Sequence, residues 1–409
     1  MRETAAAEIA PESIRAFRVQ AHHLDRKLPA GAEEAAASVC GFQNSPPGAW
    51  ETALWNRVEG CTLQAAQSAL YAEKRLLQAW SVRGVPLVFP ASESGVFLAP
   101  LAAAAGETPW IYTRGIAAAL DFLGMAFDEL LPLVLRAAEY LETHTVARKE
   151  ALDAALAEIV EAALPAEKLP LWRAPSMYGP RQTVGGAVVS FLLRPCAFYS
   201  RVVFGARDGV HPTFTSFQRW TGRAPETPPD AEKRLVQKFL HAHGPADPAA
   251  LGAWLGCGQR QAKRLWQSAA AETVPVRAAG KARHVLAADL DALRTAVCDT
   301  GVWRMLGPHD PYLDLRDRTV LLDDVQKQRI VWQTVSNPGA LLCGGRIAGV
   351  WRRSSRKRRS LWRWCCSNPQ TRRRGSRSSR RLRNTRRSAA QRCGRSFFSG
   401  PGEPVRFGD

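Results

Sequence analysis

The chain has 409 residues, of which 46% are hydrophobic, enough to fill the cores of two or three domains. Its formal net charge is +19. However, 19 of the 56 basic residues and only 2 of the 37 acidic residues lie from Trp351 onward, which leaves 37 basic and 35 acidic residues before it. The overall charge therefore does not indicate that the residues before Trp351 bind DNA. Any electrostatic evidence for DNA binding by that part must come from local basic patches.

Other composition features exclude several classes of protein. No window of about eighteen apolar residues and no positively charged start with a long apolar run is present, so we expect a cytoplasmic protein without a signal peptide or membrane span. The nine cysteines include no C-x-x-C pair and have no histidine at ligand spacing. We therefore expect buried reduced thiols, with no disulfide framework, metal or small-molecule cofactor.

The first predicted unit contains the stretch "CGFQNSPPGAW". We expect a helix over 33–40, a turn over 41–45 and a second helix over 46–58, with Asn44 and Ser45 as caps and a proline in the first helical position. The following run "RLLQAWSVRGVPLVFP" alternates like a strand and turns at Arg83 and Gly84, which predicts a hairpin. The stretch is thus interpreted as the turn of a helix-turn-helix, although an ordinary solvated turn remains an alternative.

A weaker copy of this pattern is predicted between Pro109 and Trp220, and the clearest copy follows it. In the clearest copy, Asp247 caps a helix, Gly256 to Gly258 make a turn, and a second helix covers 259–270. A hairpin around 279–281 then resembles a basic wing. An ordinary solvated basic face is the alternative to DNA binding by these units. The long basic side chains that we expect to contact DNA are Arg83, Arg260, Lys263, Arg264 and Lys281.

The segment after the third unit contains the short apolar runs "TVLLDD", "RIVWQTV" and "GALLCGGRIAGVW", which predict a small β unit. Pro-rich runs at 226–229 and 306–312 are interpreted as module borders. The expected fold class is α+β, mainly α, with tandem winged helix-turn-helix modules. The expected domains are a first winged helix over 1–105, a second over 106–225, a third over 226–300, a β element over 301–350 and a tail over 351–409.

The Arg- and Ser-rich tail has no hydrophobic period, yet it contains tryptophans and paired cysteines. Such a mixture is typical of a GC-rich gene translated out of frame, so a frameshifted terminus is favoured over a native basic arm. In either case we expect the tail to be disordered, because it has too few patterned apolar residues to offset its chain entropy.

Two further polar groups have ordinary interpretations. His22 and His23 are expected to be solvated or capping residues of a partly exposed helical segment rather than metal ligands. A group of aspartates interleaved with Arg316 and Arg318 is expected to form salt bridges rather than a cation site. Its members are Asp314, Asp317, Asp323 and Asp324.

Several separated motifs, taken in order, resemble the AlkZ-like family of bacterial DNA glycosylases over roughly residues 12–351. The motifs are "CGFQNSPPGAWETALWNRVEG", "AWSVRGVPLVFP", "FLHAHGPADPAALGAWLG", "LGPHDPYLDLRDRTVLLDD" and "NPGALLCGGRIAGVW". The resemblance implies three winged helices, a C-terminal β element and the excision of alkylated purines from double-stranded DNA. The resemblance thus implies a DNA-repair enzyme that is a monofunctional glycosylase, a hydrolase of N-glycosidic bonds.

The resemblance also implies a catalytic signature, Gln–apolar–Gln or Gln–apolar–Asp. Gln43 matches its first residue, whereas Asn44 and Ser45 stand at the other two positions. In the hairpin, Arg83 and Gly84 match the family pattern, but Val85 and Leu87 stand where a Thr and a His are common. We therefore take Gln43 and Ser45 as the candidate catalytic residues, with a catalytically silent DNA-binding regulator or a protein-interaction scaffold as alternatives.

Overall fold

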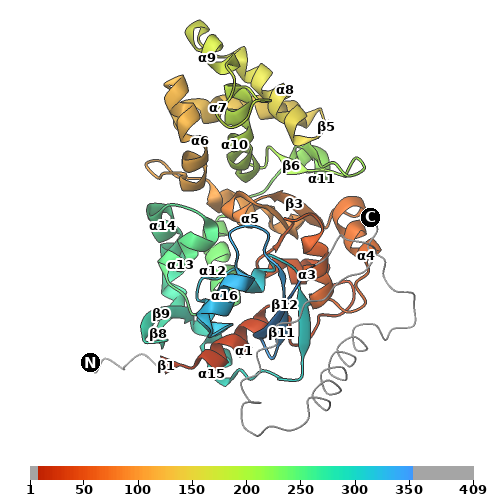
Figure 1. Cartoon of the computed structure of the whole chain (residues 1–409), viewed down its shortest axis with the longest axis vertical. Helices are drawn as coiled ribbons and strands as arrows, with labels where there is room; N and C mark the ends of the chain where they lie inside the picture. Colours follow the sequence, from red (N-terminus) through yellow and green to blue (C-terminus); the bar gives the residue numbers. More distant parts are fainter. Residues whose placement is uncertain (1–7, 353–409) are drawn as a thin grey trace, which may run out of the picture.

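A computed structural model of the chain describes residues 8–352, with the side chains of 110–114 left out (Figure 1). Within this range, helices combine with four three-stranded sheets, so the expected α+β class is confirmed. Figure 1 shows two lobes: helices α6 to α10 form one, and most of the other described elements form the second. The predicted tail lies almost wholly outside the described residues.

The first unit differs from the expected helix-turn-helix because a strand lies between its helices. Phe42 and Gln43 pair antiparallel with Val88 and Leu87, so the segment expected to be only a turn contributes to a sheet ordered β2-β4-β3. The expected hairpin is confirmed by the pairing of β3 with β4. The elements are α2 (Glu33–Ser38), β2 (Phe42–Gln43), α3 (Ala49–Arg57), α4 (Leu63–Gln67), β3 (Leu76–Trp80) and β4 (Pro86–Pro90).

The second unit repeats the general order of helix, short strand, helices and hairpin, with additional helices. Its short first strand again pairs with the last strand of the hairpin, giving the order β5-β7-β6. The hairpin encloses a turn in which Asp208 and His211 form an isolated bridge. The elements are α6 (Trp110–Leu123), α7 (Phe127–Ala137), β5 (Val146–Ala147), α8 (Lys149–Glu161), α9 (Leu169–Arg173), α10 (Val184–Phe198), β6 (Val203–Phe204), β7 (Thr213–Thr215) and α11 (Phe217–Thr221).

The third unit matches its sequence signals most closely. The Asp247 carboxylate accepts a hydrogen bond from the backbone N–H of Ala250, and Gly256 ends the helix with φ +73°. Residue Ala246 forms a bridge with His284, so a short segment before the second helix again meets the last strand. The elements are α12 (Ala231–His243), α13 (Pro248–Leu255), α14 (Gln259–Ala269), β8 (Thr273–Ala278) and β9 (Lys281–Leu286).

The C-terminal region is a three-stranded antiparallel sheet with a helix, not the purely β unit expected. The hairpin of β11 and β12 is confirmed, but the run "RIVWQTV" begins within helix α16. This helix forms because the Asp324 carboxylate accepts hydrogen bonds from the N–H groups of Gln326 and Lys327. The elements are α15 (Leu290–Thr295), β10 (Trp303–Leu306), α16 (Val325–Val331), β11 (Gly339–Cys343) and β12 (Arg346–Trp351).

The N-terminal segment crosses the chain to pack on its later half. Strand β1 (Glu8–Ile9) pairs in parallel with β8, and helix α1 (Pro11–Ala21) packs against α12 and α15. Side chains of α1, including Ile14 and Phe17, share a core with the C-terminal sheet. A second core joins the first and third units, where Phe89 and Phe97 lie with Phe239 and Leu265. These shared cores hold the first, third and C-terminal parts together.

The described residues also bear on the expectations about membrane spans and cysteines. No helix within the described residues is both long and apolar enough to cross a membrane. The six cysteines in residues 8–352 form no disulfide, and three of them, Cys40, Cys61 and Cys196, are buried.

The Pro-rich run at 226–229 packs against α5 (Ser94–Leu98), and this contact leads to a prediction. A Cβ at Gly95 would lie 2.2 Å from the Glu226 carbonyl oxygen, which is too close for two non-bonded atoms. We expect Gly95→Ala to lower the free energy of unfolding by about 1–3 kcal/mol, the usual cost of overpacking, as measured by urea denaturation. Gly179→Ala is the control, because a Cβ there meets no atom within 4 Å. Equal stability of the two variants would contradict this contact.

Candidate DNA glycosylase site

Gln43 lies on β2, at a place that backbone geometry restricts. Gly41 has φ +71°, and a Cβ there would come within 2.5 Å of the Leu87 side chain, so glycine is required before the strand. Strand pairing then fixes Gln43 opposite Leu87. The candidate catalytic residue is thus held on a sheet, which is a stiffer support than the turn expected from the sequence.

Gln43 is 8% exposed, and its carboxamide is bonded at both ends. Its Nε2 donates to the Ser45 carbonyl at 3.2 Å, and its Oε1 accepts a long bond of 3.5 Å from the Arg83 guanidinium. The two bonds use one N–H and one lone pair, which leaves one of each for a water or a substrate.

Asn44 and Ser45 do not cap a helix at Pro46, because α3 begins only at Ala49. Asn44 Oδ1 accepts a hydrogen bond from the Gly48 N–H at 2.7 Å, and its Nδ2 donates to Gln78 at 2.9 Å. The Asn44 side chain therefore organises the turn and faces inward, whereas Ser45 is half-buried. The two residues have different environments although they are adjacent.

Arg83 connects Gln43 to parts of the chain that are distant in sequence. It lies between β3 and β4 with φ +58°, and its guanidinium donates to the Trp254 carbonyl at 2.9 Å and to Asp314 at 2.8 Å. The Asp314 carboxylate lies next to the short helix at Pro311–Leu313. The first unit, α13 and the C-terminal region thus converge at one polar cluster.

Burial perturbs two ionisable groups of this cluster. Burial raises the pKa of the Asp314 carboxyl, and the neighbouring Arg83 opposes that shift. The pKa of His309 is lowered by burial, while the Asp314 charge opposes this shift and Arg83 adds to it. Sequence reasoning missed His309 because it lies in a run interpreted as a linker. The usable signal was a His-Asp pair framed by two prolines, which is unusual in a solvated linker.

A buried ion pair orders the segment that carries Asp314 of the polar cluster. Arg57 on α3 forms a two-pronged bond with Asp310, with N···O distances of 2.9 and 2.8 Å, and both side chains are fully enclosed. Asp310 also accepts a bond from the Tyr312 N–H at 3.1 Å, which orders the turn leading to Asp314. Removal of one partner would leave a buried charge uncompensated.

The expected salt bridging of the acidic group is confirmed, but its partners are not Arg316 and Arg318. Each aspartate pairs with a basic residue outside that interleaved run. Three of these basic partners lie on elements that are distant in the sequence. Neighbouring residues in the sequence therefore could not indicate them. The pairs are Arg83–Asp314, Arg18–Asp317, Arg346–Asp323 and Lys327–Asp324.

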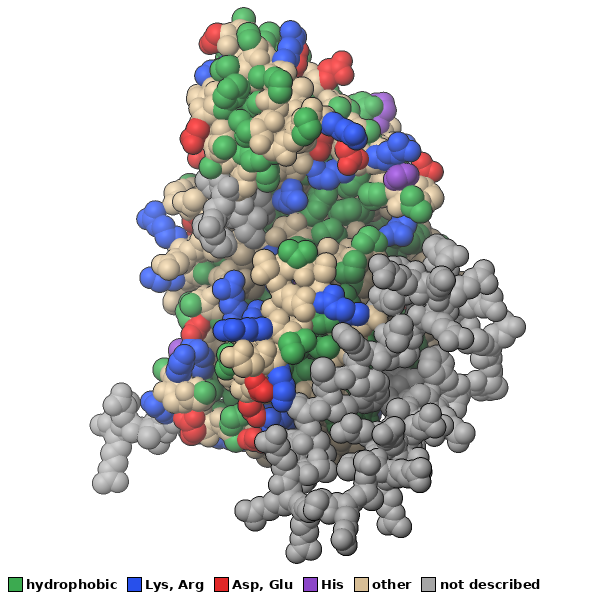
Figure 2. Space-filling model, viewed as in Figure 1, with side chains coloured by type: hydrophobic (Ala, Val, Ile, Leu, Met, Phe, Trp, Pro, Cys, Tyr) green, Lys and Arg blue, Asp and Glu red, His purple; other side chains and the backbone are tan. Residues whose placement is uncertain are grey.

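Two of the three basic residues of α14 that are expected to contact DNA form bonds within the chain. Arg264 pairs with Glu107 at 2.7 Å and also with Glu232, and Arg260 donates to the Gly106 carbonyl at 2.9 Å. Lys263 is exposed on the same helix, and Lys281 is exposed at the start of β9. On the face drawn in Figure 2, basic side chains surround the junction of the lobes, whereas acidic ones gather mainly above and below it.

Comparisons with known proteins identify a family and two similar proteins. Residues 36–389 match the family described as DNA glycosylase AlkZ-like, a match that extends into the tail. An interstrand DNA cross-link repair glycosylase from Streptomyces sahachiroi is 24% identical over 351 residues, which cover 82% of this chain and 86% of that protein. The solved structure of the Streptomyces sahachiroi DNA glycosylase AlkZ has a TM-score of 0.67 at 21% identity, covering 86% of this chain and 90% of the other. From its motifs and this match over most of its length, the chain belongs to the AlkZ-like DNA glycosylase family.

Proposed function

We propose that this protein is a monofunctional glycosylase that hydrolyses the N-glycosidic bond of alkylated purines in double-stranded DNA. The observation that carries the proposal is the cluster of Gln43, Arg83 and Asp314, in which a carboxamide keeps free bonding capacity beside a half-buried carboxylate. Family membership supports a glycosylase-type function, and the family substrate makes DNA the expected partner.

The chemistry suits a labile lesion. An N7-alkylated guanine already carries positive charge and leaves readily, so the protein has mainly to position water and stabilise a sugar with oxocarbenium character. The free lone pair of Gln43 orients the water, and the Asp314 carboxylate supplies negative charge nearby. Ser45 reaches less far than Gln or Asp would, so we expect slow excision of a charged base and none of a neutral one.

We further propose that the three repeated units are winged helices. In the first two, the short strand before the second helix pairs with the last hairpin strand, giving the orders β2-β4-β3 and β5-β7-β6. In the third unit the Ala246–His284 bridge occupies the same position. This repeated topology, with a helix preceding each hairpin, supports the expected module borders at about residues 105, 225 and 300.

The test measures abasic sites in duplex DNA that contains N7-methylguanine, with the parent protein and the Ser45→Gln variant. We expect slow excision by the parent and faster excision by Ser45→Gln, because the longer carboxamide restores a second group that can hold the water. Duplex binding is measured in parallel by fluorescence anisotropy. If both proteins bind DNA but release no base, the catalytic proposal fails and a silent DNA-binding protein replaces it.

The DNA surface is proposed to use exposed basic side chains of the third unit. Replacing Lys263 and Lys281 together by Ala should reduce the slope of log K against log salt by about 2, because each lost phosphate contact contributes about 0.9. Arg260, Arg264 and Arg83 remain proposed contacts through the exposed parts of their side chains, but their bonds within the chain make alanine variants harder to interpret. Lys327→Ala on α16, a half-buried lysine that pairs with Asp324, is the control outside the third unit. An unchanged slope in the double variant would remove this surface from the interface.

A further inference from the structure

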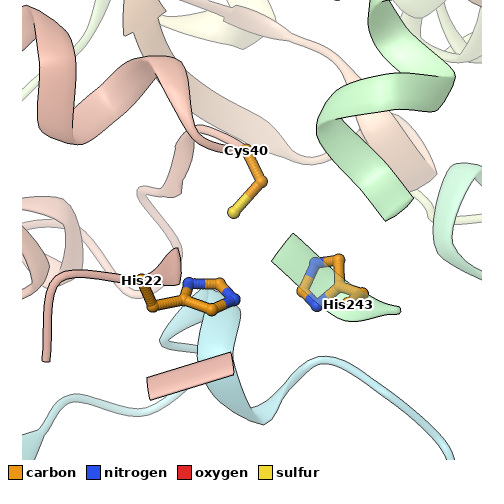
Figure 3. A group of neighbouring side chains, drawn as sticks. All are labelled: His22, Cys40 and His243. Carbon is orange, nitrogen blue, oxygen red and sulfur yellow. The ribbon is translucent and has the colours of Figure 1, made fainter. Parts of the chain in front are cut away.

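A buried group of three possible metal ligands lies close to β2, and the proposed function does not use it. His22 follows α1, Cys40 follows α2, and His243 ends α12, so the three come from distant parts of the sequence. All three side chains are buried, and one potential ligand atom from each lies within 4.8 Å of the other two. Figure 3 shows the Cys40 sulfur directed toward the space beside the two imidazole rings.

The hydrogen bonding of His22 leaves one of its two ring nitrogens without a partner among the described residues. His22 Nε2 lies 3.0 Å from the Ala242 carbonyl oxygen, which can only accept, so Nε2 carries the proton. The remaining nitrogen, Nδ1, is buried and has no hydrogen-bond partner among the described residues. A histidine whose other ring nitrogen donates to a backbone carbonyl has the usual arrangement of a metal ligand.

His243 provides a second, independent observation. Its Nε2 is also buried without a hydrogen-bond partner in the described part of the chain, and its ring centre lies 5.2 Å from that of His22. A buried polar atom left unpaired costs about 1–3 kcal/mol. Two such atoms on histidines grouped with one buried thiol are poorly explained as simple core packing, whereas one bound ion would satisfy both. His22 was expected to be solvated or capping, but its ring is enclosed.

We propose that His22 Nδ1, Cys40 Sγ and His243 Nε2 bind one monovalent thiophilic ion, Cu(I). Thiolate and imidazole are ligands that Cu(I) and Zn(II) both accept. Zn(II) prefers four ligands, and the described residues offer three here. A Zn(II) thiolate would also leave one net positive charge in a site that already has Arg18 and Arg57 nearby. Cu(I) with one thiolate is neutral, which suits burial.

Binding exchanges one proton for one ion. Burial raises the pKa of the Cys40 thiol to about 12, so the free thiol is protonated at neutral pH. Coordination forms one Cu–S and two Cu–N bonds, and the thiol proton passes to solvent. No electron is transferred. The ion would tie the segment before Gln43 to α1 and α12, and this inference does not depend on excision activity.

The experiment measures Cu(I) binding by competition with a chromogenic Cu(I) chelator under anaerobic conditions. The full chain is used with Cys365, Cys366 and Cys393 replaced by Ser, because these thiols outside the described residues would add binding of their own. We expect one tightly held equivalent, and an X-ray absorption spectrum with one sulfur and two nitrogen neighbours. Cys40→Ser and His243→Gln should each weaken binding at least 100-fold, whereas Cys196→Ser and His241→Gln should not change it.

The thiol control is matched in burial, and the imidazole control is matched in its place on the same helix. Cys196 is a buried thiol of the second unit, and His241 is an exposed imidazole on the same helix as His243. Circular dichroism establishes that each variant is folded, and the His22→Gln variant replaces any that is not. Failure of the folded parent to retain Cu(I), or undiminished binding by Cys40→Ser and His243→Gln, would overturn the site. Preferential retention of Zn(II) from an equimolar mixture would overturn the choice of ion.

Discussion

Replacing Asp310 by Ala is expected to lower the free energy of unfolding by about 3–5 kcal/mol, because it leaves the Arg57 guanidinium charged and enclosed without a counter-ion. Arg57 and Asp310 are 1% and 0% exposed. Among the residues that the structure describes, Arg57 keeps a bond to the Ala53 carbonyl at 2.9 Å and a contact with the Phe42 ring at 5.2 Å. Urea denaturation measures the change.

Two further variants separate the charge from the shape of this pair. Glu161→Ala breaks an ion pair with Arg173, whose side chain is 63% exposed, and should change the free energy of unfolding little. Replacing Arg57 and Asp310 together by Leu should recover part of the loss, because no unpaired charge remains. If Asp310→Ala lowers the free energy of unfolding no more than Glu161→Ala does, the Arg57–Asp310 pair does not stabilise the polar cluster.

Replacing Gln43 by Ala is expected to slow excision of N7-methylguanine on the order of 100-fold, because the group that orients the water is lost. Duplex affinity should change little, since Gln43 is nearly buried and carries no charge. The rate is measured in single-turnover reactions with excess protein, so that weaker binding cannot imitate slower chemistry.

The control for Gln43 is Gln67→Ala, on α4 and outside the cluster. A second comparison, Gln43→Glu, keeps the length of the side chain but places a carboxylate beside Arg83 and Asp314, which tests whether charge or geometry matters. Excision by Gln43→Ala at the parent rate would reduce Gln43 to a structural residue of the β2 segment, bonded to the Ser45 carbonyl.

The sequence alone determined those features whose causes lie within a few residues. The cap at Asp247, the turn that begins at Gly256 and the hairpin at Arg83 and Gly84 all depend on local turn chemistry, and the sequence predicts each of them. Ordered motifs also indicated the family, because their residues remain recognisable without knowledge of their contacts.

The tertiary structure alone decided what distant segments do to one another. Phe42 and Gln43 form a strand only because β4 presents a pairing edge, and Arg83 turns inward because Asp314 and the Trp254 carbonyl lie there. The approach of His22, Cys40 and His243 likewise depends on three separate helix ends meeting. No local pattern encodes such meetings, since burial and hydrogen bonding between segments hundreds of residues apart are set by how the shared cores pack.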